Sequence, residues 1–227
     1  MSIVLDSVSH GFGARRVLDA ISCTLTERRI GVIGANGSGK STFARLLNGL
    51  VLPDEGRVAI DGRDTRTETK AVRRRVGFVF QNPDNQIVYP IVAEDVAFGL
   101  KRLRLPKAEL ARRVAETLER FGLSHLADQG AHVLSGGEKQ LLALAGVLAG
   151  APEILVLDEP TTLLDLRNTR RIARILEDLP QRVVLVTHDL ALLETFERVL
   201  VLDGGRIVAD DRPGPAITAY RALMEAP

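Results

Sequence analysis

The sequence has little from which a disulfide framework or a reactive thiol site could be built. Its 227 residues include one cysteine, Cys23, which has no partner within the chain, so an internal disulfide scaffold is excluded. Cys23 lies in the alternating stretch 21–25. We expect an inert, half-buried strand residue there.

Long hydrophobic runs and a charge excess are also missing. The most apolar stretch, Leu141–Pro152, is shorter than the roughly 20 residues that a spanning helix needs. The N-terminus lacks the basic start and apolar core of a signal peptide, so we expect a soluble chain in the cytoplasm. Lys and Arg number 30 against 29 Asp and Glu, which argues against a general polyanion-coating role. No internal repeat suggests a solenoid array.

Short runs rich in Val, Ile and Leu predict strands of two kinds. Some are apolar almost throughout, which fits strands buried on both faces of a parallel sheet: Ile30–Ile33, Val76–Phe80, Ile154–Leu157 and Val183–Val186. Others are more mixed, and several lie beside hairpin-type turn signals: Ile3–Val8, Arg57–Ile60, Val199–Leu202 and Arg206–Val208. One mainly parallel sheet and one antiparallel sheet are therefore predicted.

Helical spacing is clearest in Pro106–Phe121, where apolar residues recur on one side and charged residues occupy the other. Further helices are predicted at Lys40–Leu47, Ser135–Ala149 and Asp165–Leu179. No strand is evident between about residues 90 and 149. We therefore predict one domain over 1–227, with a core of 1–85 and 150–227 and a helical subdomain, 86–149, inserted into it.

The run Gly34–Ser41 has the spacing G-x-x-x-x-G-K-S between a predicted strand and a predicted helix, the context in which this motif binds nucleotide phosphates. Its glycines allow backbone N–H groups to turn toward an anion, and the helix start adds its dipole. Lys40 would reach the β and γ phosphates, and Ser41 would ligate Mg²⁺. The predicted nucleotide-contacting residues of this segment are Gly34, Asn36, Gly37, Ser38, Gly39, Lys40, Ser41 and Thr42.

Polar side chains follow two of the buried strands. Neighbouring side chains of an extended chain point to opposite faces, so Asp158 can hold Mg²⁺ through its water shell while Glu159 faces the attacking water. His188 follows the strand 183–186, and ligands of open α/β sheets collect at such carboxyl ends. We predict that His188 contacts the γ-phosphate and steadies the water and Glu159.

A second phosphate-binding feature is predicted at Ser135-Gly136-Gly137. Ser135 suits a helix N-cap, but two glycines in the first turn cost up to about 1 kcal/mol each. Bare N–H groups at a helix start bind phosphate oxygens. Because the chain already has one phosphate loop, these residues are predicted to act on a partner's nucleotide; a plain serine cap with flexible glycines is the alternative.

Taken in order, the phosphate loop, Gln81, LSGGE, LVLDEP, Asp165 and His188 resemble the motifs of the ATP-binding cassette (ABC) ATPases over nearly the whole chain. The stretches 79–86, 94–99 and 135–140 are similar to the energy-coupling-factor branch, which drives vitamin and transition-metal uptake. The resemblance implies an α/β fold: a P-loop, RecA-like core with a mainly parallel sheet, an antiparallel β-subdomain and an inserted α-helical subdomain.

The same resemblance implies roles for single residues. Phe12 would stack on adenine, although packing is an alternative for it. Gln81 would touch the metal or the water and link the site to a membrane partner. Ser135–Gly137 would cover ATP bound to a second subunit, and Asp165 would transmit the state of one nucleotide site to the other.

The assembly that the resemblance implies lies at the cytoplasmic face of the membrane. It contains a second ABC ATPase subunit, either a copy or a paralogue, an integral membrane coupling protein and a substrate-binding membrane subunit. The cofactors implied are ATP and Mg²⁺. Many cobalt-type and general vitamin-type members of this branch are longer, and in its shortness this chain resembles the dedicated biotin-type subunits. Biotin is therefore the first expectation for the cargo. Thr162-Leu163 departs from the usual Ala or Ser followed by Gly, and the contact across the dimer is expected to differ there.

Two other functions remain open from the sequence. A soluble cassette ATPase acting on nucleic acid or ribosomes is suggested by one basic cluster: Lys101, Arg102, Arg104, Lys107, Arg112 and Arg113. Two observations argue against this function: no aromatic residues lie among these charges, and the chain has no long coiled-coil insertion. We therefore expect no nucleic-acid partner. A regulatory module that binds nucleotide without hydrolysis is disfavoured by the full set of charged site residues.

Overall fold

The chain folds into two units in the computed structural model, which describes residues 2–162 and 164–225. The first unit comprises Met1–Val76, Glu153–Glu159 and Pro180–Pro227, and the second comprises Gly77–Pro152 and Pro160–Leu179. Strand β6 (Val76–Val79) begins at the boundary between them. The two units are described one after the other.

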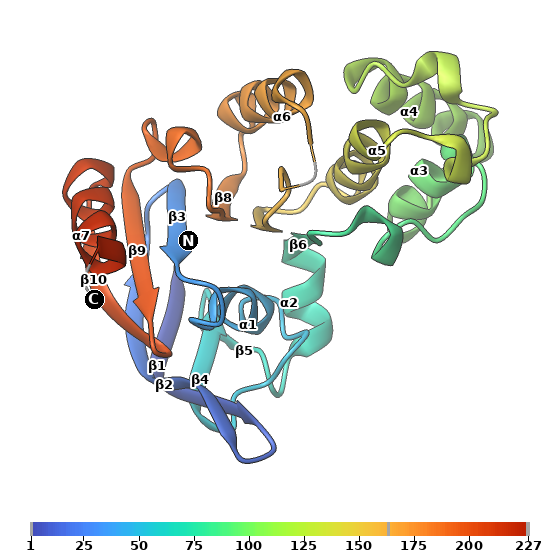
Figure 1. Cartoon of the computed structure of the whole chain (residues 1–227). Helices are drawn as coiled ribbons and strands as arrows, with labels where there is room; N and C mark the ends of the chain where they lie inside the picture. The colour runs from blue at the N-terminus through green and yellow to red at the C-terminus, as the bar shows by residue number, and fades with distance from the viewer. Residues whose placement is uncertain (1, 163, 226–227) are drawn as a thin grey trace. The chain divides into compact units, whose positions relative to one another are not determined.

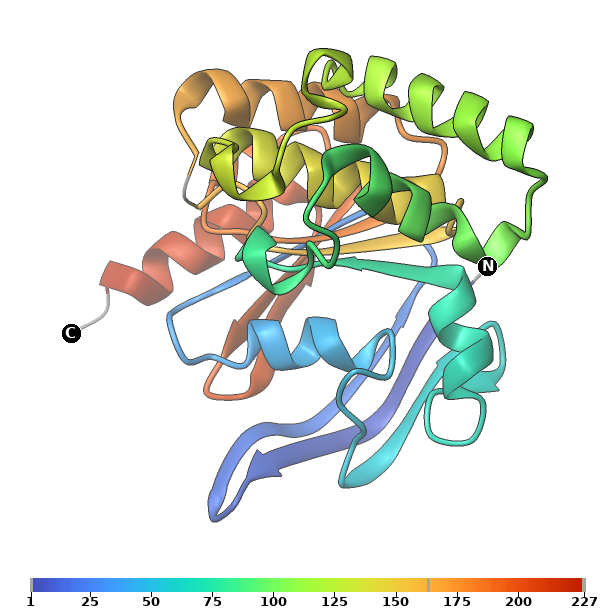
Figure 2. The same ribbon diagram turned by 90° about the vertical axis from the view of Figure 1, so that its right-hand side faces the viewer.

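An antiparallel sheet forms one part of the first unit. Its strand order is β2-β1-β4-β5, with β1 (Ile3–Phe12), β2 (Arg15–Leu25), β4 (Glu55–Ile60) and β5 (Arg63–Asp64). The β1–β2 hairpin, dark blue in Figure 2, is long, and register shifts interrupt its pairing. The alternation of apolar residues predicts extended structure only at residues 21–25. The observed strand β2 is longer and begins at Arg15.

The mainly parallel sheet places the carboxyl ends of β3, β7 and β8 side by side. The strands of the first unit lie in the order β10-β9-β3-β8-β7, with β3 (Arg29–Gly34), β7 (Ile154–Asp158), β8 (Arg182–Val186), β9 (Arg198–Asp203) and β10 (Arg206–Asp211). β3 pairs in parallel with both β8 and β9, and β7 pairs in parallel with β8. These strands are largely buried, which explains their nearly continuous apolar sequences.

Two strands belong to a different sheet from the one their sequences suggest. The runs Val199–Leu202 and Arg206–Val208 have the mixed pattern of hairpin strands, but they form parts of β9 and β10 in the mainly parallel sheet. β9 pairs in parallel with β3. Only its other edge carries the antiparallel partner, β10. The turn signal therefore predicts the hairpin correctly, but it does not reveal the parallel pairing on the far side of β9.

Helices complete the first unit. They are α1 (Lys40–Leu46), α2 (Thr69–Arg75), the short 3₁₀ helix η5 (Leu190–Leu193) and α7 (Pro213–Glu225). α1 contacts β2, β3, β7 and β8, and it follows β3 through a loop, as Figure 1 shows. Ser41, in its first turn, bonds Asp158 at the carboxyl end of β7. Neither α2 nor α7 is among the sequence-based predictions.

The second unit is helical, and within residues 80–149 its only strand-type pairing is an isolated bridge between Ile91 and Gly130. Its helices are α3 (Val92–Leu100), α4 (Lys107–Arg120), α5 (Gly136–Ala149) and α6 (Leu166–Asp178), with short 3₁₀ helices η1 (Pro83–Asn85), η2 (Lys101–Leu103), η3 (Ser124–Leu126) and η4 (Ala131–Val133). α3, α4 and α5 pack on one another (Figure 1). The helices predicted for α4, α5 and α6 are confirmed.

Candidate nucleotide-binding site

The predicted phosphate loop joins β3 to α1, and its backbone takes conformations that favour glycine. Gly37 and Gly39 have φ values of 80° and 100°, in the left-handed region. A β-carbon on Gly39 would lie 2.8 Å from the carbonyl oxygen of Val17. The hairpin strand β2 therefore packs closely against the loop, which leaves no room for a side chain at that position.

Lys40 is buried, and its ammonium group folds back onto the loop. Nζ donates hydrogen bonds to the carbonyl oxygens of Gly34 at 2.8 Å and Ala35 at 2.9 Å. Burial lowers the pKa of Lys40, while the nearby carboxylates of Glu159 and Asp158 oppose that shift. The loop thus holds a cation in place where the motif predicts phosphate binding.

Ser41 and Asp158 meet although 117 residues separate them in the chain. The Ser41 hydroxyl donates a hydrogen bond of 2.9 Å to Oδ1 of Asp158, at the end of β7. Burial raises the pKa of Asp158, and the hydrogen bond from Ser41 opposes the rise. Arg45, one turn beyond Ser41 on α1, places Nη2 3.9 Å from Oδ2 of the same carboxylate. Two oxygen ligands of the kind that Mg²⁺ prefers therefore lie together.

Glu159 and His188 come together at the ends of neighbouring strands. Nε2 of His188 lies 2.7 Å from Oε1 of Glu159. Glu159 is largely buried and has a φ of 52°, an uncommon conformation for a residue with a side chain. Its backbone N–H donates to the carbonyl oxygen of Val186, the last residue of β8, at 2.9 Å. The parallel pairing of β7 with β8 therefore places the two side chains at one sheet edge.

Two further residues of the first unit, Ser38 and Phe12, are relevant to nucleotide binding. The hydroxyl of Ser38 is buried without a hydrogen-bond partner among the described residues, so it is free to donate to an anion in the loop. Phe12, at the end of β1, is 56% exposed and stands edge-on to His10 with 4.9 Å between ring centroids. An exposed ring at a hairpin end is consistent with a stacking platform. Thr42 is buried in α1, whereas Asn36 and Gly37 are exposed.

The predicted second phosphate feature lies in the second unit, at the start of α5. Ser135 and Glu138 form a reciprocal capping box: Ser135 Oγ accepts from the Glu138 N–H at 3.3 Å, and Glu138 Oε2 accepts from the Ser135 N–H at 2.8 Å. A β-carbon on Gly136 would meet nothing within 4 Å, but one on Gly137 would overlap the side chain of Asn168 in α6. The two glycines therefore have different surroundings.

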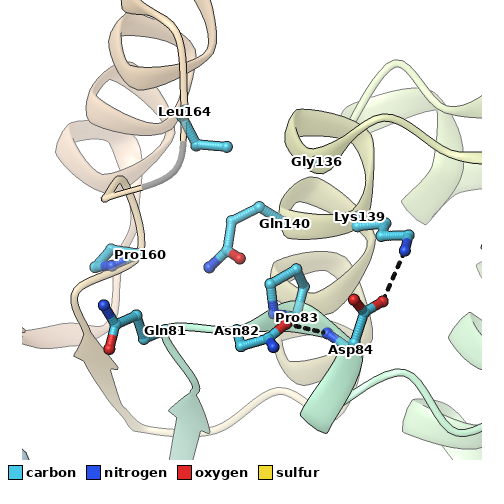
Figure 3. Close-up of a pocket in the computed structure, with 9 residues that line it drawn as sticks. All are labelled: Gln81, Asn82, Pro83, Asp84, Gly136, Lys139, Gln140, Pro160 and Leu164. Carbon is cyan, nitrogen blue, oxygen red and sulfur yellow. Dashed lines mark hydrogen bonds and ion pairs between the residues drawn. The ribbon is translucent and has the colours of Figure 1, made fainter.

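Gln81 lines a small pocket in the second unit, shown in Figure 3. The pocket has a volume of about 140 Å³ and is lined by Gln81, Asn82, Pro83, Asp84, Gly136, Lys139, Gln140, Pro160 and Leu164. Lys139 Nζ lies 2.7 Å from Asp84 Oδ1, and Asn82 Oδ1 accepts a hydrogen bond from the Asp84 N–H at 3.0 Å. Asp165 caps α6 by accepting from the Asn168 N–H at 2.8 Å.

The predicted site residues thus fall into two groups. Lys40, Ser41, Asp158, Glu159 and His188 come together in the first unit. Gln81, Ser135, Gly136, Gly137 and Asp165 belong to the second. Leu163, where the sequence departs from the ABC pattern, lies outside the described residues.

Comparison with known proteins decides the family. The model of the family described as "ABC transporter" matches residues 18–162, which include the phosphate loop, the capped glycine pair and the acidic strand end. The chain belongs to the ABC transporter family. It is an ABC ATPase, a P-loop NTP hydrolase coupled to transport.

Among its relatives, the ABC ATPase is 53% identical to the biotin transport ATP-binding protein BioM of Rhizobium etli, over 98% of this chain and 99% of that protein. It is similar to the solved structure of cbiO1 from Clostridium perfringens, part of the ABC transporter complex cbiONQ, with a TM-score of 0.83, 31% identity and coverage of 98% and 92% of the two chains. It also matches the dimeric, post-hydrolysis cassette MJ0796 bound to ADP and Pi, with a TM-score of 0.84, 30% identity and coverage of 93% and 98%. The predicted fold class and the resemblance to energy-coupling-factor ATPases are confirmed.

Other features of this ABC ATPase bear on the expected inert thiol and on the alternative function in nucleic-acid binding. Half-buried Cys23 has its pKa raised by burial to about 12, as expected for an inert thiol. In the basic cluster, Arg112 pairs with Glu109 and Glu116, and Arg113 pairs with Glu109. Part of that cluster is therefore neutralised on the surface of α4. No described helix is long and apolar enough to span a bilayer.

Sequence reasoning missed three residues that contact the site. Arg45 follows Ser41 by four residues on α1, so helical spacing alone could have indicated it. Asn168 and Arg15 lie beside the positions that β-carbons on Gly137 and Gly37 would take. They have no sequence signal, because each lies far along the chain from its glycine.

Proposed function

We propose that this ABC ATPase powers an importer of the energy-coupling-factor type whose cargo is biotin. The BioM relative, which matches this chain at 53% identity over nearly its whole length, supports that cargo. The likeness to cbiO1, a part of the cbiONQ complex, supports an assembly with membrane subunits. In this assembly the chain is peripheral, at the cytoplasmic face of the membrane. It binds an integral membrane coupling protein and works beside a substrate-binding membrane subunit.

The contact between Glu159 and His188 carries the catalytic part of the proposal. In the proposed reaction, Glu159 accepts a proton from the water that attacks the γ-phosphorus of ATP, and His188 steadies both this carboxylate and the γ-phosphate. Lys40 leaves the carbonyl oxygens of Gly34 and Ala35 to meet the developing negative charge. The backbone N–H groups of residues 36–42 hold the remaining phosphate oxygens.

Ser41 and Asp158 fit the Mg²⁺ that this chemistry requires. Their oxygens lie 2.9 Å apart, and both are hard ligands. When bound, Mg²⁺ neutralises charge on the β and γ phosphates. Ser41 would bind it directly and Asp158 through a water shell, while Gln81 would reach the metal or the water and connect the site with the membrane partner.

The proposed active unit is a dimer with a second ABC ATPase subunit, either a copy or a paralogue. Ser135, Gly136 and Gly137 of one chain cover the ATP held by the phosphate loop of the other. Phe12 stacks on the adenine, and Asp165 transmits the state of one nucleotide site to the other. The dimeric state of the similar cassette MJ0796 supports this arrangement.

A transport experiment tests the proposal. The chain is co-purified in detergent with its membrane partners, which are identified, and the complex is placed in proteoliposomes. We expect ATP-dependent uptake of labelled biotin, which stops when the chain carries Glu159→Gln. Uptake of Co²⁺ without biotin would contradict the cargo alone, whereas purification without any membrane partner would contradict the coupled assembly.

A further inference from the structure

One arginine of the β1–β2 hairpin leans toward the phosphate loop. Arg15 is the first residue of β2 and is exposed. Its Nη2 atom lies 3.5 Å from the point that a β-carbon on Gly37 would occupy. Gly37 is itself exposed, in the middle of the loop. A cationic side chain thus lies beside the exposed Gly37 of the loop.

Nearby carboxylates do not account for this position, because other groups engage them. Asp19 pairs with Arg16 at 2.7 Å and with Arg206 at 2.5 Å. Glu55 lies 3.5 Å from Arg16. Asp54 accepts the Gly11 N–H at 2.8 Å and lies 3.2 Å from His10. Among the described residues, Arg15 has no ion-pair partner.

We infer that Arg15 is a further nucleotide-binding residue, which contacts the phosphate chain from the hairpin side. A guanidinium group donates several N–H bonds in one plane and matches phosphate oxygens well. It is also permanently charged, so its attraction to a polyphosphate does not depend on pH. Arg15 then acts beside Gly37 and not where Lys40 and Ser41 act. Beside Gly37 the loop itself offers only backbone N–H groups.

This inference rests on the phosphate loop being the nucleotide site, as the proposed function has it. It assigns Arg15 a role in affinity for phosphorylated ligands, not in the chemical step. The neighbouring Arg16 provides a matched control, because it carries the same charge on the same hairpin but is held by Asp19 and Glu55.

Equilibrium binding of ADP to the purified full chain, in Mg²⁺ buffer, tests the inference. We expect Arg15→Gln to weaken ADP binding about 5- to 20-fold at 50 mM NaCl, Arg15→Lys to weaken it less, and Arg16→Gln to change it less than twofold. The difference between wild type and Arg15→Gln should shrink at 500 mM NaCl, because salt screens an exposed charge pair. Melting temperatures without nucleotide check that each variant is folded.

Two results would overturn the inference: Arg15→Gln within twofold of wild type, or Arg16→Gln weakening ADP binding as much as Arg15→Gln. Lys40→Ala separates this failure from that of the proposed site. If Lys40→Ala weakens ADP binding and Arg15→Gln does not, only the role of Arg15 is wrong. If neither variant weakens it, the phosphate loop is not the nucleotide site.

Discussion

The imidazole of His188 and the carboxylate of Glu159 lie 2.7 Å apart, although they are 29 positions apart in the chain. They meet because β7 and β8 pair in parallel and end at the same edge of the sheet. Glu159 is buried beside this histidine and close enough to Lys40 to affect its pKa. The fold therefore brings the proposed catalytic pair together at one edge of the parallel sheet.

Replacing this carboxylate should separate ATP binding from hydrolysis. Glu159→Gln keeps the shape of the side chain but removes the proton acceptor, so we expect turnover to fall at least about 100-fold while ATP affinity stays near wild type. Phosphate release and equilibrium ATP binding measure the two effects. Glu194→Gln, at an exposed position, serves as the control. Near-normal hydrolysis by Glu159→Gln would show that another group activates the water.

Ser135→Arg should abolish ATPase activity without weakening ATP binding to the isolated chain. A large cation at the capped start of α5 would block the surface that the proposal assigns to a partner's nucleotide. Ser135→Ala removes the cap alone and should cost about 1 kcal/mol of stability. Ser124→Arg, at an exposed position of the same unit, controls for the added charge.

The concentration dependence of the wild-type ATPase completes that test. A site shared between two chains predicts specific activity that rises with protein concentration until the dimer is saturated. Constant specific activity down to nanomolar chain, together with full activity of Ser135→Arg, would be incompatible with the shared site.

The two glycines at the start of α5 should respond oppositely to alanine. Gly136 has open space where a β-carbon would lie, so Gly136→Ala should stabilise the chain by up to about 1 kcal/mol. Gly137→Ala should destabilise it by about 1 to 3 kcal/mol, because the methyl group overlaps Asn168. Adding Asn168→Ala should restore much of that loss. Urea unfolding measures all three variants, and equal stabilities of Gly136→Ala and Gly137→Ala would contradict the contact.

Cys23 should react slowly with thiol reagents in the folded chain. With its pKa raised from 9.0 to about 12, the thiolate fraction at pH 8 falls about 1,000-fold. Because the raised pKa means that the proton leaves only at high pH, the rate of reaction with iodoacetamide should still climb about tenfold per pH unit between pH 8 and 10. The urea-unfolded chain should level off above about pH 9. A similar plateau in the folded chain would show an accessible, ordinary thiol.

The sequence by itself determined the local parts of this protein. The glycine spacing before Lys40 predicts a strand, a tight loop and a helix, because positive φ angles and close backbone approach admit little else. Apolar runs predict buried parallel strands, and their polar ends predict Asp158, Glu159 and His188 as site residues. Ser135 and Glu138 predict a helix start through their spacing alone.

Only the tertiary structure decided which distant residues meet. It placed Val199–Leu202 beside β3, Arg15 beside Gly37 and Asn168 against Gly137. The physical reason is that turn and capping preferences act over a few residues, whereas the pairing of strands and the packing of helices depend on the burial of whole faces. A contact of that kind leaves no spacing in the sequence by which it could be recognised.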